Sequence, residues 1–207
     1  MPSKGSGGGA AGATGRGGGR ATQAEPRAFA AGDAASMNDW GRENYGAWAG
    51  GLASYEKTAI RQYQANDYIK INRTLREGTL LSATGVIPDQ VQAITAALDR
   101  AVVPEAVIAY RGLSSKFKAK DVAVGQLFTD HGFMSTSLNV ESSEQLSSGM
   151  MLRIKVPKGT KGAYLDSFFR NLGEHELLIQ RGSSFRIGKT TIIDGVPHID
   201  LTLKSQR

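Results

Sequence analysis

The sequence of 207 residues contains no cysteine, which excludes a disulfide framework, a thiolate metal site and a cysteine nucleophile. It has no apolar run that approaches the roughly 20 residues of a membrane span. Its N-terminus is rich in glycine, whereas a secretory signal peptide needs an apolar segment there. We therefore expect no membrane partner and no metal. If the protein leaves its cell, other machinery must carry it, and otherwise we expect it in the cytoplasm.

Positive charge is in excess but is unevenly spread. The formal net charge is +6, and Lys4, Arg16 and Arg20 all precede the first acidic residue, Glu25, so half of the excess belongs to the N-terminal end. No interleaved aromatic and basic motif accompanies this charge, so we do not expect a nucleic-acid partner. Hydrophobic residues form 40% of the chain and charged residues 21%, which is typical of a globular protein.

The chain divides into two parts by composition. Residues 1–32 begin with nine glycines in the first twenty positions and show no apolar periodicity, which predicts a disordered tail or linker. Residues 33–207 have a length that one hydrophobic core can serve, so we expect a single domain there.

Helices are predicted in the first half of this domain. Residues 39–78 have aromatic and aliphatic side chains at helical spacing, which predicts two or three helices. Ser54 and Asn66 are candidate N-caps, and Gly78 is a candidate C-terminal stop. Residues 88–100 predict a further helix that starts with a proline in its first turn.

After Pro104 the pattern changes to short runs rich in valine, isoleucine, phenylalanine and threonine, which are typical of strands. Asp194-Gly195 separates the last two runs and is a strong turn signal for a hairpin. Helices followed by strands predict an α+β fold, with an N-terminal helical cap packed on a two-sheet β-sandwich core. The expected strands are residues 106–111, 126–128, 132–137, 150–156, 162–165, 175–180, 184–193 and 197–204.

Tyr110-Arg111-Gly112 places an arginine at the end of an apolar run, beside a glycine that lets a ligand approach the backbone. The planar guanidinium suits a diphosphate, because it can donate two parallel hydrogen bonds to phosphate oxygens. An arginine that caps a strand end in solvent would give the same pattern, so Arg111 alone assigns no function.

Ser135-Thr136-Ser137 lies in a predicted strand, whose period of two sends Ser135 and Ser137 to one face and Thr136 to the other. Two hydroxyls that point into one space can fix a neighbouring carboxylate. Serine and threonine also occur in ordinary strands, so this motif needs support from elsewhere.

Glu174-His175-Glu176 opens an apolar run. The same alternation predicts both carboxylates on one side of the strand and His175 on the other. A carboxylate pair can support cleavage at a sugar carbon, where one group stabilises the developing positive charge and bonds the neighbouring hydroxyl. A solvated acidic strand end is the plain alternative.

The order of these three motifs resembles the Arg, Ser-Thr-Ser, Glu-x-Glu signature of mono-ADP-ribosyltransferases, the family that includes the actin-modifying binary toxins. The resemblance covers the chain from about residue 40 onward and includes two more segments. Tyr63, Tyr68 and Asn72 are similar to helical positions that border the adenosine half of NAD in the toxins. Residues 151–159 are similar to the strand with the family's second phosphate-binding arginine, which would be Arg153.

This resemblance implies an ADP-ribosyltransferase fold with NAD as the co-substrate and no metal. Arg111 and Arg153 would hold the diphosphate, and the backbone of Gly112 would receive the nicotinamide amide. Ser135 would orient Glu176. The Glu176 carboxylate would bond the ribose 2′-hydroxyl and stabilise positive charge as nicotinamide leaves.

Glu174 matches the family position that receives the acceptor. A glutamate there usually accompanies an arginine acceptor and a glutamine an asparagine acceptor, so the resemblance implies a target protein with an acceptor arginine. The preceding loop faces the protein substrate in the family, so Phe168 or Phe169 would contact the target unless one of them returns to the core. One departure concerns residues 138–149, which contain no aromatic side chain to stack on nicotinamide.

The expected function is therefore NAD-dependent transfer of ADP-ribose to an arginine of a target protein. The expected setting is a toxin or effector that is secreted or delivered into a target cell, where an immunity protein could be a second partner. Two alternatives remain open. An NAD glycohydrolase would use water in place of the acceptor, and a non-catalytic phage or structural binding module would keep the fold without turnover.

Overall fold

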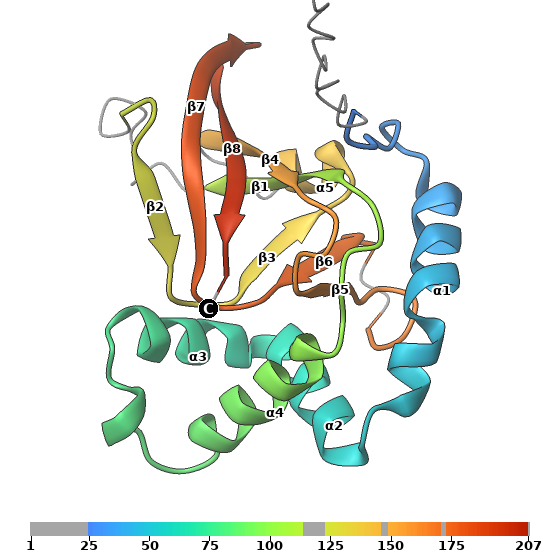
Figure 1. Ribbon diagram of the computed structural model, residues 1–207, viewed down its shortest axis with the longest axis vertical. Helices are drawn as coiled ribbons and strands as arrows, with labels where there is room; N and C mark the ends of the chain where they lie inside the picture. Colours follow the sequence, from blue (N-terminus) through green and yellow to red (C-terminus); the bar gives the residue numbers. More distant parts are fainter. Residues whose placement is uncertain (1–24, 114–122, 146–148, 171–172, 207) are drawn as a thin grey trace, which may run out of the picture.

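The computed structural model describes residues 25–113, 123–145, 149–170 and 173–206, and its helices come first (Figure 1). These are α1 (Ala34–Gly51), α2 (Ser54–Gln62), the π-helical turn η1 (Tyr63–Asp67), α3 (Tyr68–Arg76), the short turn η2 (Leu80–Ser82) and α4 (Ile87–Asp99). A further short helix, α5 (Val140–Gln145), lies between strands. None of the described helices is both long enough and apolar enough to cross a membrane.

Within the described residues, eight strands form a sheet in the order β2-β7-β8-β4-β1-β3-β6-β5. Neighbouring strands are antiparallel except β4 and β8, which are parallel. The predicted α+β class and the eight predicted strands are confirmed. The strands are β1 (Val107–Leu113), β2 (Leu127–Asp130), β3 (Met134–Ser137), β4 (Met150–Val156), β5 (Gly162–Tyr164), β6 (Glu176–Ile179), β7 (Ser183–Ile193) and β8 (Val196–Ser205).

The predicted division into two sheets under a helical cap is not confirmed. Hydrogen bonds link the eight strands continuously, from β2 at one edge to β5 at the other. In Figure 1, β7 and β8 run across the direction of β1 and β4, while α2, α3 and α4 lie together at one end of the sheet. A strongly twisted sheet gives the same alternation of buried and exposed residues as two packed sheets, so the sequence pattern could not separate them.

The three strands that contain the predicted motifs are neighbours in the sheet. β1 pairs with β3 at Tyr110 and Ser137, and Ser137 in turn pairs with Glu176 of β6. β6 is buried along its whole length, as its apolar run requires. The register therefore brings the arginine, serine and glutamate motifs to one part of the sheet.

Two predicted helix caps are wrong. Ser54 is the first residue of α2, and the amide of the preceding Ala53 donates to Glu56 Oε2 at 2.9 Å, so a carboxylate satisfies this helix start. Asn66 lies inside η1, where the helix continues from α2 into α3 and needs no cap. The stop at Gly78 is confirmed, since this glycine follows α3 with a φ of 70°.

Residues 25–32, which composition assigned to the tail, lie against the domain. The Arg27 amide donates to the Ala106 oxygen at 2.7 Å, beside β1. Phe29 is buried and packs edge-on against Trp40 at 5.7 Å. The domain therefore begins before the predicted boundary at residue 32. The sequence did not indicate this, because a short segment with one aromatic residue shows no apolar periodicity. Residues 1–24 of the predicted tail lie outside the described residues.

Gly41 of α1 packs directly on the ring of Tyr164 in β5. A Cβ atom at this position would lie 2.5 Å from Cε1 of Tyr164. The ring has little room to move, because it is buried and its hydroxyl donates to Asn38 Oδ1 at 2.7 Å. We therefore expect Gly41→Ala to lower the free energy of unfolding by about 1–3 kcal/mol.

Gly46, in the same helix, provides the matched control. No atom lies within 4 Å of a Cβ built there. Gly46→Ala should therefore raise the free energy of unfolding by about 0.5–1 kcal/mol through helix propensity. Urea denaturation of the two variants measures the difference, and equal midpoints would contradict the close packing of α1 on β5.

Candidate active site

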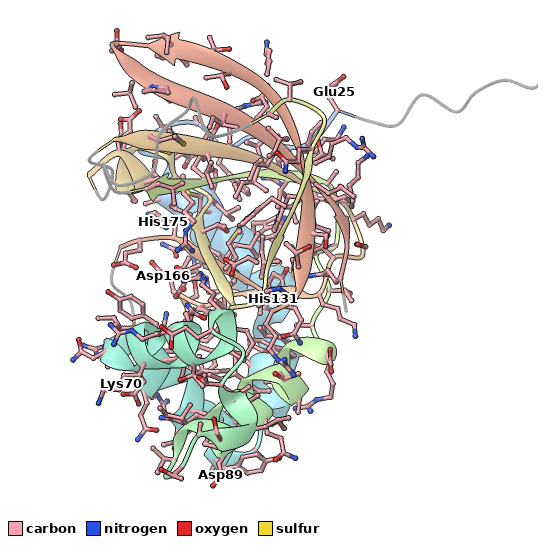
Figure 2. All side chains as sticks on the ribbon, turned by 90° about the vertical axis from the view of Figure 1, so that its left-hand side faces the viewer. Glu25, Lys70, Asp89, His131, Asp166 and His175 are labelled. Atoms are coloured by element: carbon pink, nitrogen blue, oxygen red, sulfur yellow. The ribbon has the colours of Figure 1, made fainter. Side chains whose placement is uncertain are left out.

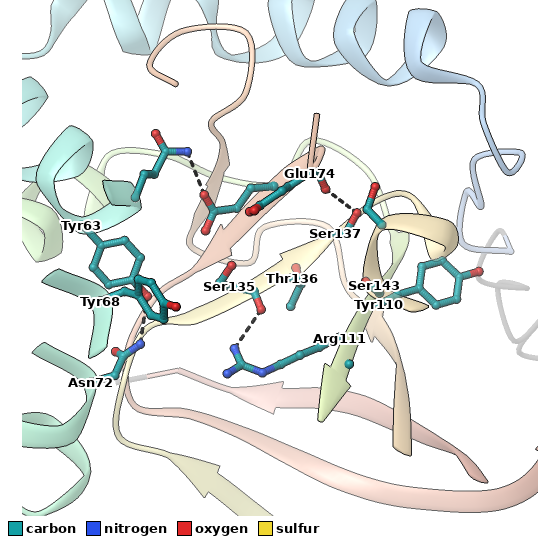
Figure 3. A pocket seen from close by; sticks show the side chains of 14 residues that line it. Tyr63, Tyr68, Asn72, Tyr110, Arg111, Ser135, Thr136, Ser137, Ser143 and Glu174 are labelled. Carbon is teal, nitrogen blue, oxygen red and sulfur yellow. Dashed lines mark hydrogen bonds between the residues drawn. The ribbon is translucent and has the colours of Figure 1, made fainter. Parts of the chain in front are cut away.

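A cavity of about 310 Å³ opens where β1, β3 and β6 meet η1 and α3 (Figure 3). This volume is at the lower end of the range of about 300–1,000 Å³ found for small-molecule sites. Most of the predicted site residues line it. They are Tyr63, Tyr68, Asn72, Arg111, Gly112, Ser135, Glu174 and Glu176.

Glu176 begins β6 and is only 4% exposed. Burial raises the pKa of its carboxyl to about 7, although hydrogen bonds from Ser135 and Gln64 lower it. The Gln64 side-chain amide donates to Glu176 Oε2 at 2.8 Å. A buried carboxyl with a pKa near neutrality, in a cleft, is typical of a group that takes part in chemistry.

Arg111 presents a guanidinium from β1 to the same cavity. Its Nη1 donates to the main-chain oxygen of Ser135 at 2.9 Å (Figure 3). Desolvation lowers the pKa of Arg111, and the nearby Asp130 carboxylate opposes this effect. The group stays cationic because the guanidinium of arginine ordinarily titrates far above neutral pH. The cavity therefore contains a positive charge next to the side-chain-free Gly112.

The three hydroxyls of β3 make different hydrogen bonds. The Ser135 side chain bonds Glu176. Thr136 Oγ1 donates to the Leu177 oxygen at 2.6 Å, and Ser137 Oγ donates to the Glu174 oxygen at 2.6 Å. All three residues line the cavity, so its lining does not confirm the predicted separation of the two serines from Thr136, and Ser137 fixes the backbone of the glutamate motif and not a carboxylate.

A turn, and not a strand, presents Glu174. β6 begins only at Glu176, and His175 before it has a left-handed backbone with a φ of 50°. The extended strand backbone from which the sides of residues 174–176 were predicted is therefore absent before Glu176. Both glutamates nevertheless line the cavity, and the His175 ring points away from it, with Nδ1 3.1 Å from the Tyr164 hydroxyl.

Asp166 supports this turn from the loop after β5. Its Oδ2 accepts the His175 amide at 2.8 Å, and its Oδ1 accepts the Glu176 amide at 3.4 Å. Figure 2 shows Asp166 and His175 close together on the same side of the molecule. Two backbone amides that donate to one buried carboxylate fix the backbone that connects the two glutamates.

The helical wall of the cavity depends on η1. Tyr63 and Asn72 are nine residues apart, which is about two and a half turns of a regular α-helix and would place them on opposite faces. The wider π-helical turn shifts the phase, so that Asn72 Nδ2 donates to the Tyr63 hydroxyl at 3.0 Å. Asn72 Oδ1 also accepts the Phe133 amide at 2.9 Å, which fastens α3 to the start of β3.

Three predicted residues do not line the cavity. The Arg153 side chain is 47% exposed and pairs with Asp200 of β8 at 3.5 Å. Phe168 and Phe169 are half-buried and pack against the core, and Phe169 contacts Trp48 edge-on at 6.1 Å. The alternative that one of these aromatic residues returns to the core is therefore closer to their contacts, since both pack against it.

The sequence analysis did not select Gln64 or Asp166. A glutamine beside Tyr63 and an aspartate after a short strand have no distinctive pattern in a single sequence. The sequence held one indication of an irregular helix. Tyr63 and Asn72 can both border one ligand site only if the helix between them departs from regular α-helical geometry. Gln64 lies in this irregular turn next to Tyr63, and both residues line the cavity.

Comparison with known proteins agrees with this geometry. Residues 37–205 match the family model for the ADP-ribosyltransferase exoenzyme. The NAD(+)--arginine ADP-ribosyltransferase EFV of Enterococcus faecalis is 24% identical over 162 residues, which cover 74% of this chain and 32% of that protein. The mono-ADP-ribosyltransferase C3 of a Clostridium botulinum C phage is 27% identical over 177 residues, which cover 74% of this chain and 70% of that protein.

Among solved structures, C3stau2 from S. aureus with NAD has a similar fold. The TM-score is 0.77 at 22% identity, over 88% of this chain and 100% of that chain. The chain spans about a third of the Enterococcus relative, so the match concerns one part of that longer protein. Because the family model matches residues 37–205, which include every residue that lines the cavity, this chain belongs to the ADP-ribosyltransferase exoenzyme family.

Proposed function

We propose that the protein transfers ADP-ribose from NAD to an arginine side chain of a target protein and releases nicotinamide. The observation that supports this most directly is that Arg111, Ser135, Glu174 and Glu176 line one cavity. The Enterococcus relative is named as an NAD-arginine ADP-ribosyltransferase, and the similar S. aureus structure is described with NAD. The family description as exoenzymes supports a secreted or delivered toxin or effector.

Arg111 is the residue that would bind the NAD diphosphate. A guanidinium offers parallel N–H donors to phosphate oxygens, and its desolvated position strengthens that attraction. The backbone of the adjacent Gly112 would bond the nicotinamide amide, since no side chain separates it from the cavity. The proposal gives no role to Arg153, which pairs with Asp200 outside the cavity.

Glu176 would act in its ionised form. NAD supplies an ADP-ribosyl group whose bond to nicotinamide breaks with positive charge on the ribose. The Glu176 carboxylate would bond the ribose 2′-hydroxyl and stabilise that charge from a fixed position, because Ser135 and Gln64 already bond it. Because the carboxylate is already oriented before positive charge develops on the ribose, no free energy is lost in rearranging dipoles during the reaction.

Glu174 would bind the acceptor. Burial and then the nearby Asp166 raise the pKa of its carboxyl, which makes it a better base than an exposed glutamate. A carboxylate can also hold the planar guanidinium of an arginine by two hydrogen bonds. Phe168 and Phe169 remain candidate contacts to the target through their exposed parts.

Mass spectrometry of a lysate incubated with the protein and NAD tests this proposal. We expect one or a few proteins to gain ADP-ribose, and fragmentation should place it on arginine. Heat-denatured enzyme with the same NAD is the control. Modification of another residue type would contradict the proposed acceptor, and nicotinamide release without any labelled protein would favour the glycohydrolase.

A further inference from the structure

Gln64 connects three separate segments at the cavity. It lies in η1, and its side chain is 9% exposed. Its Nε2 donates to Glu176 Oε2 at 2.8 Å, and its Oε1 accepts the main-chain amide of Arg170 at 3.2 Å. One amide group therefore joins the helical wall, the glutamate of β6 and the loop before Glu174.

The two hydrogen bonds fix which way the amide group points. The Arg170 amide can only donate, so the Gln64 oxygen must face it, and the Gln64 nitrogen must then face Glu176. The hydrogen bond from the Arg170 amide thus fixes the orientation in which the Gln64 nitrogen donates to Glu176. Gln64 lies in the π-helical turn, and both it and the neighbouring Tyr63 line the cavity.

We propose that Gln64 is a positioning residue of the transfer reaction, which fixes one oxygen of Glu176 and links its orientation to the backbone at Arg170. This inference rests on the proposed function, in which the loop before Glu174 lies at the acceptor side. A target protein that shifts the backbone at Arg170 would then shift the Gln64 side chain, and through it Glu176, without touching Glu176.

The charges around Glu176 define what loss of Gln64 should do. Glu174 and Asp166, from the loops before β6, both disfavour the ionised carboxyl. Arg111 of β1 and Tyr63 of η1 also interact electrostatically with Glu176. Ser135 and Gln64 are the hydrogen-bond donors that favour ionisation. Removal of the Gln64 donor should therefore raise the pKa of Glu176.

Two variants remove the amide group without adding a charge beside Glu176. Gln64→Leu and Gln64→Met both lack the donor to Glu176 and the amide oxygen that accepts from Arg170, and methionine keeps the unbranched shape of the side chain. Gln62→Ala is the matched control, because it removes an exposed glutamine at the end of α2 that accepts from Gln90 and does not line the cavity. Carbon-13 NMR of the glutamate carboxyls in the protein without NAD measures the midpoint of Glu176.

We expect the Glu176 midpoint to move to higher pH in both Gln64 variants and to stay in place in Gln62→Ala. The kcat of transfer near pH 7 should fall roughly tenfold in Gln64→Leu, with the NAD KM changed less than about threefold. The loss should become smaller at alkaline pH, where Glu176 is ionised in either protein. A general folding defect would lower the rate equally at every pH.

An unchanged Glu176 midpoint in a folded Gln64 variant would overturn the proposal, and so would a rate loss independent of pH. If Gln64→Leu does not fold, the same comparison with Gln64→Met decides the outcome. The NMR titration needs no turnover. A wild-type protein without transferase activity would therefore contradict the proposed function while the titration still tests the role of Gln64.

Discussion

Replacement of Glu176 by glutamine is expected to lower the rate of ADP-ribose transfer by about a thousandfold. The variant keeps the shape of the side chain and a group that can bond Ser135, but it has no negative charge for the ribose. Glu176 is buried among η1, β3 and β6, so no water or other carboxylate can take its exact place without a rearrangement. The effect should appear in kcat, because the lost interaction strengthens only as the bond to nicotinamide breaks.

Transfer of labelled ADP-ribose measures this effect, and calorimetry with NAD shows whether the variant still binds the co-substrate. Glu43→Gln, at an exposed position on α1, is the control for the loss of a carboxylate elsewhere. A Glu176→Gln protein that binds NAD and transfers at more than about a tenth of the wild-type rate would remove Glu176 from the proposed role.

The stability of the protein should also depend on pH through the Glu176 carboxyl. Burial raises its pKa from 4.5 to about 7, so the folded protein holds the proton more tightly than the unfolded chain does. Its contribution to stability is therefore complete below about pH 4.5 and is lost as the pH rises through 7, a change on the order of 3 kcal/mol. Thermal denaturation of Glu176→Gln should lack this loss.

The strands and the order of the motifs could be predicted from the sequence because they depend on local signals. Apolar runs with period two, bounded by glycine and aspartate, predict strands, and Asp194-Gly195 predicts the hairpin that joins β7 and β8. The resemblance then selected Arg111, Ser135 and Glu176, which the register of β1, β3 and β6 brings together. That selection needed the joint order of the motifs, since each one alone has an ordinary structural explanation.

The remaining parts of the site could not be predicted because they depend on contacts between distant segments. The left-handed His175 is stabilised by Asp166 and Tyr164, and neither partner is marked in the sequence around the glutamates. The π-helical turn at η1 has no proline or glycine inside it, so composition does not indicate it. Both irregularities lie next to the cavity, where the backbone adopts conformations that its local sequence does not favour and so places side chains in the site.

Exchange of Glu174 for glutamine is expected to lower transfer to arginine by about a hundredfold while nicotinamide release from NAD persists. Glu174 reaches the cavity from the turn before β6, separately from the strand that holds Glu176. Its backbone oxygen, not its side chain, accepts the hydrogen bond from Ser137, so the substitution leaves this anchor in place. The acceptor guanidinium would lose its ionic partner and the base that removes its proton, whereas water needs neither.

Parallel assays of labelled protein and of free nicotinamide measure the two reactions in the same sample. Glu77→Gln, at the exposed end of α3, is the matched control and should change neither rate. An equal loss of both reactions would mean that the two glutamates act as one unit in breaking the bond to nicotinamide. A selective loss would instead mean that the turn at His175 keeps two carboxylates close together for different steps, which explains why a strained backbone is tolerated at this position.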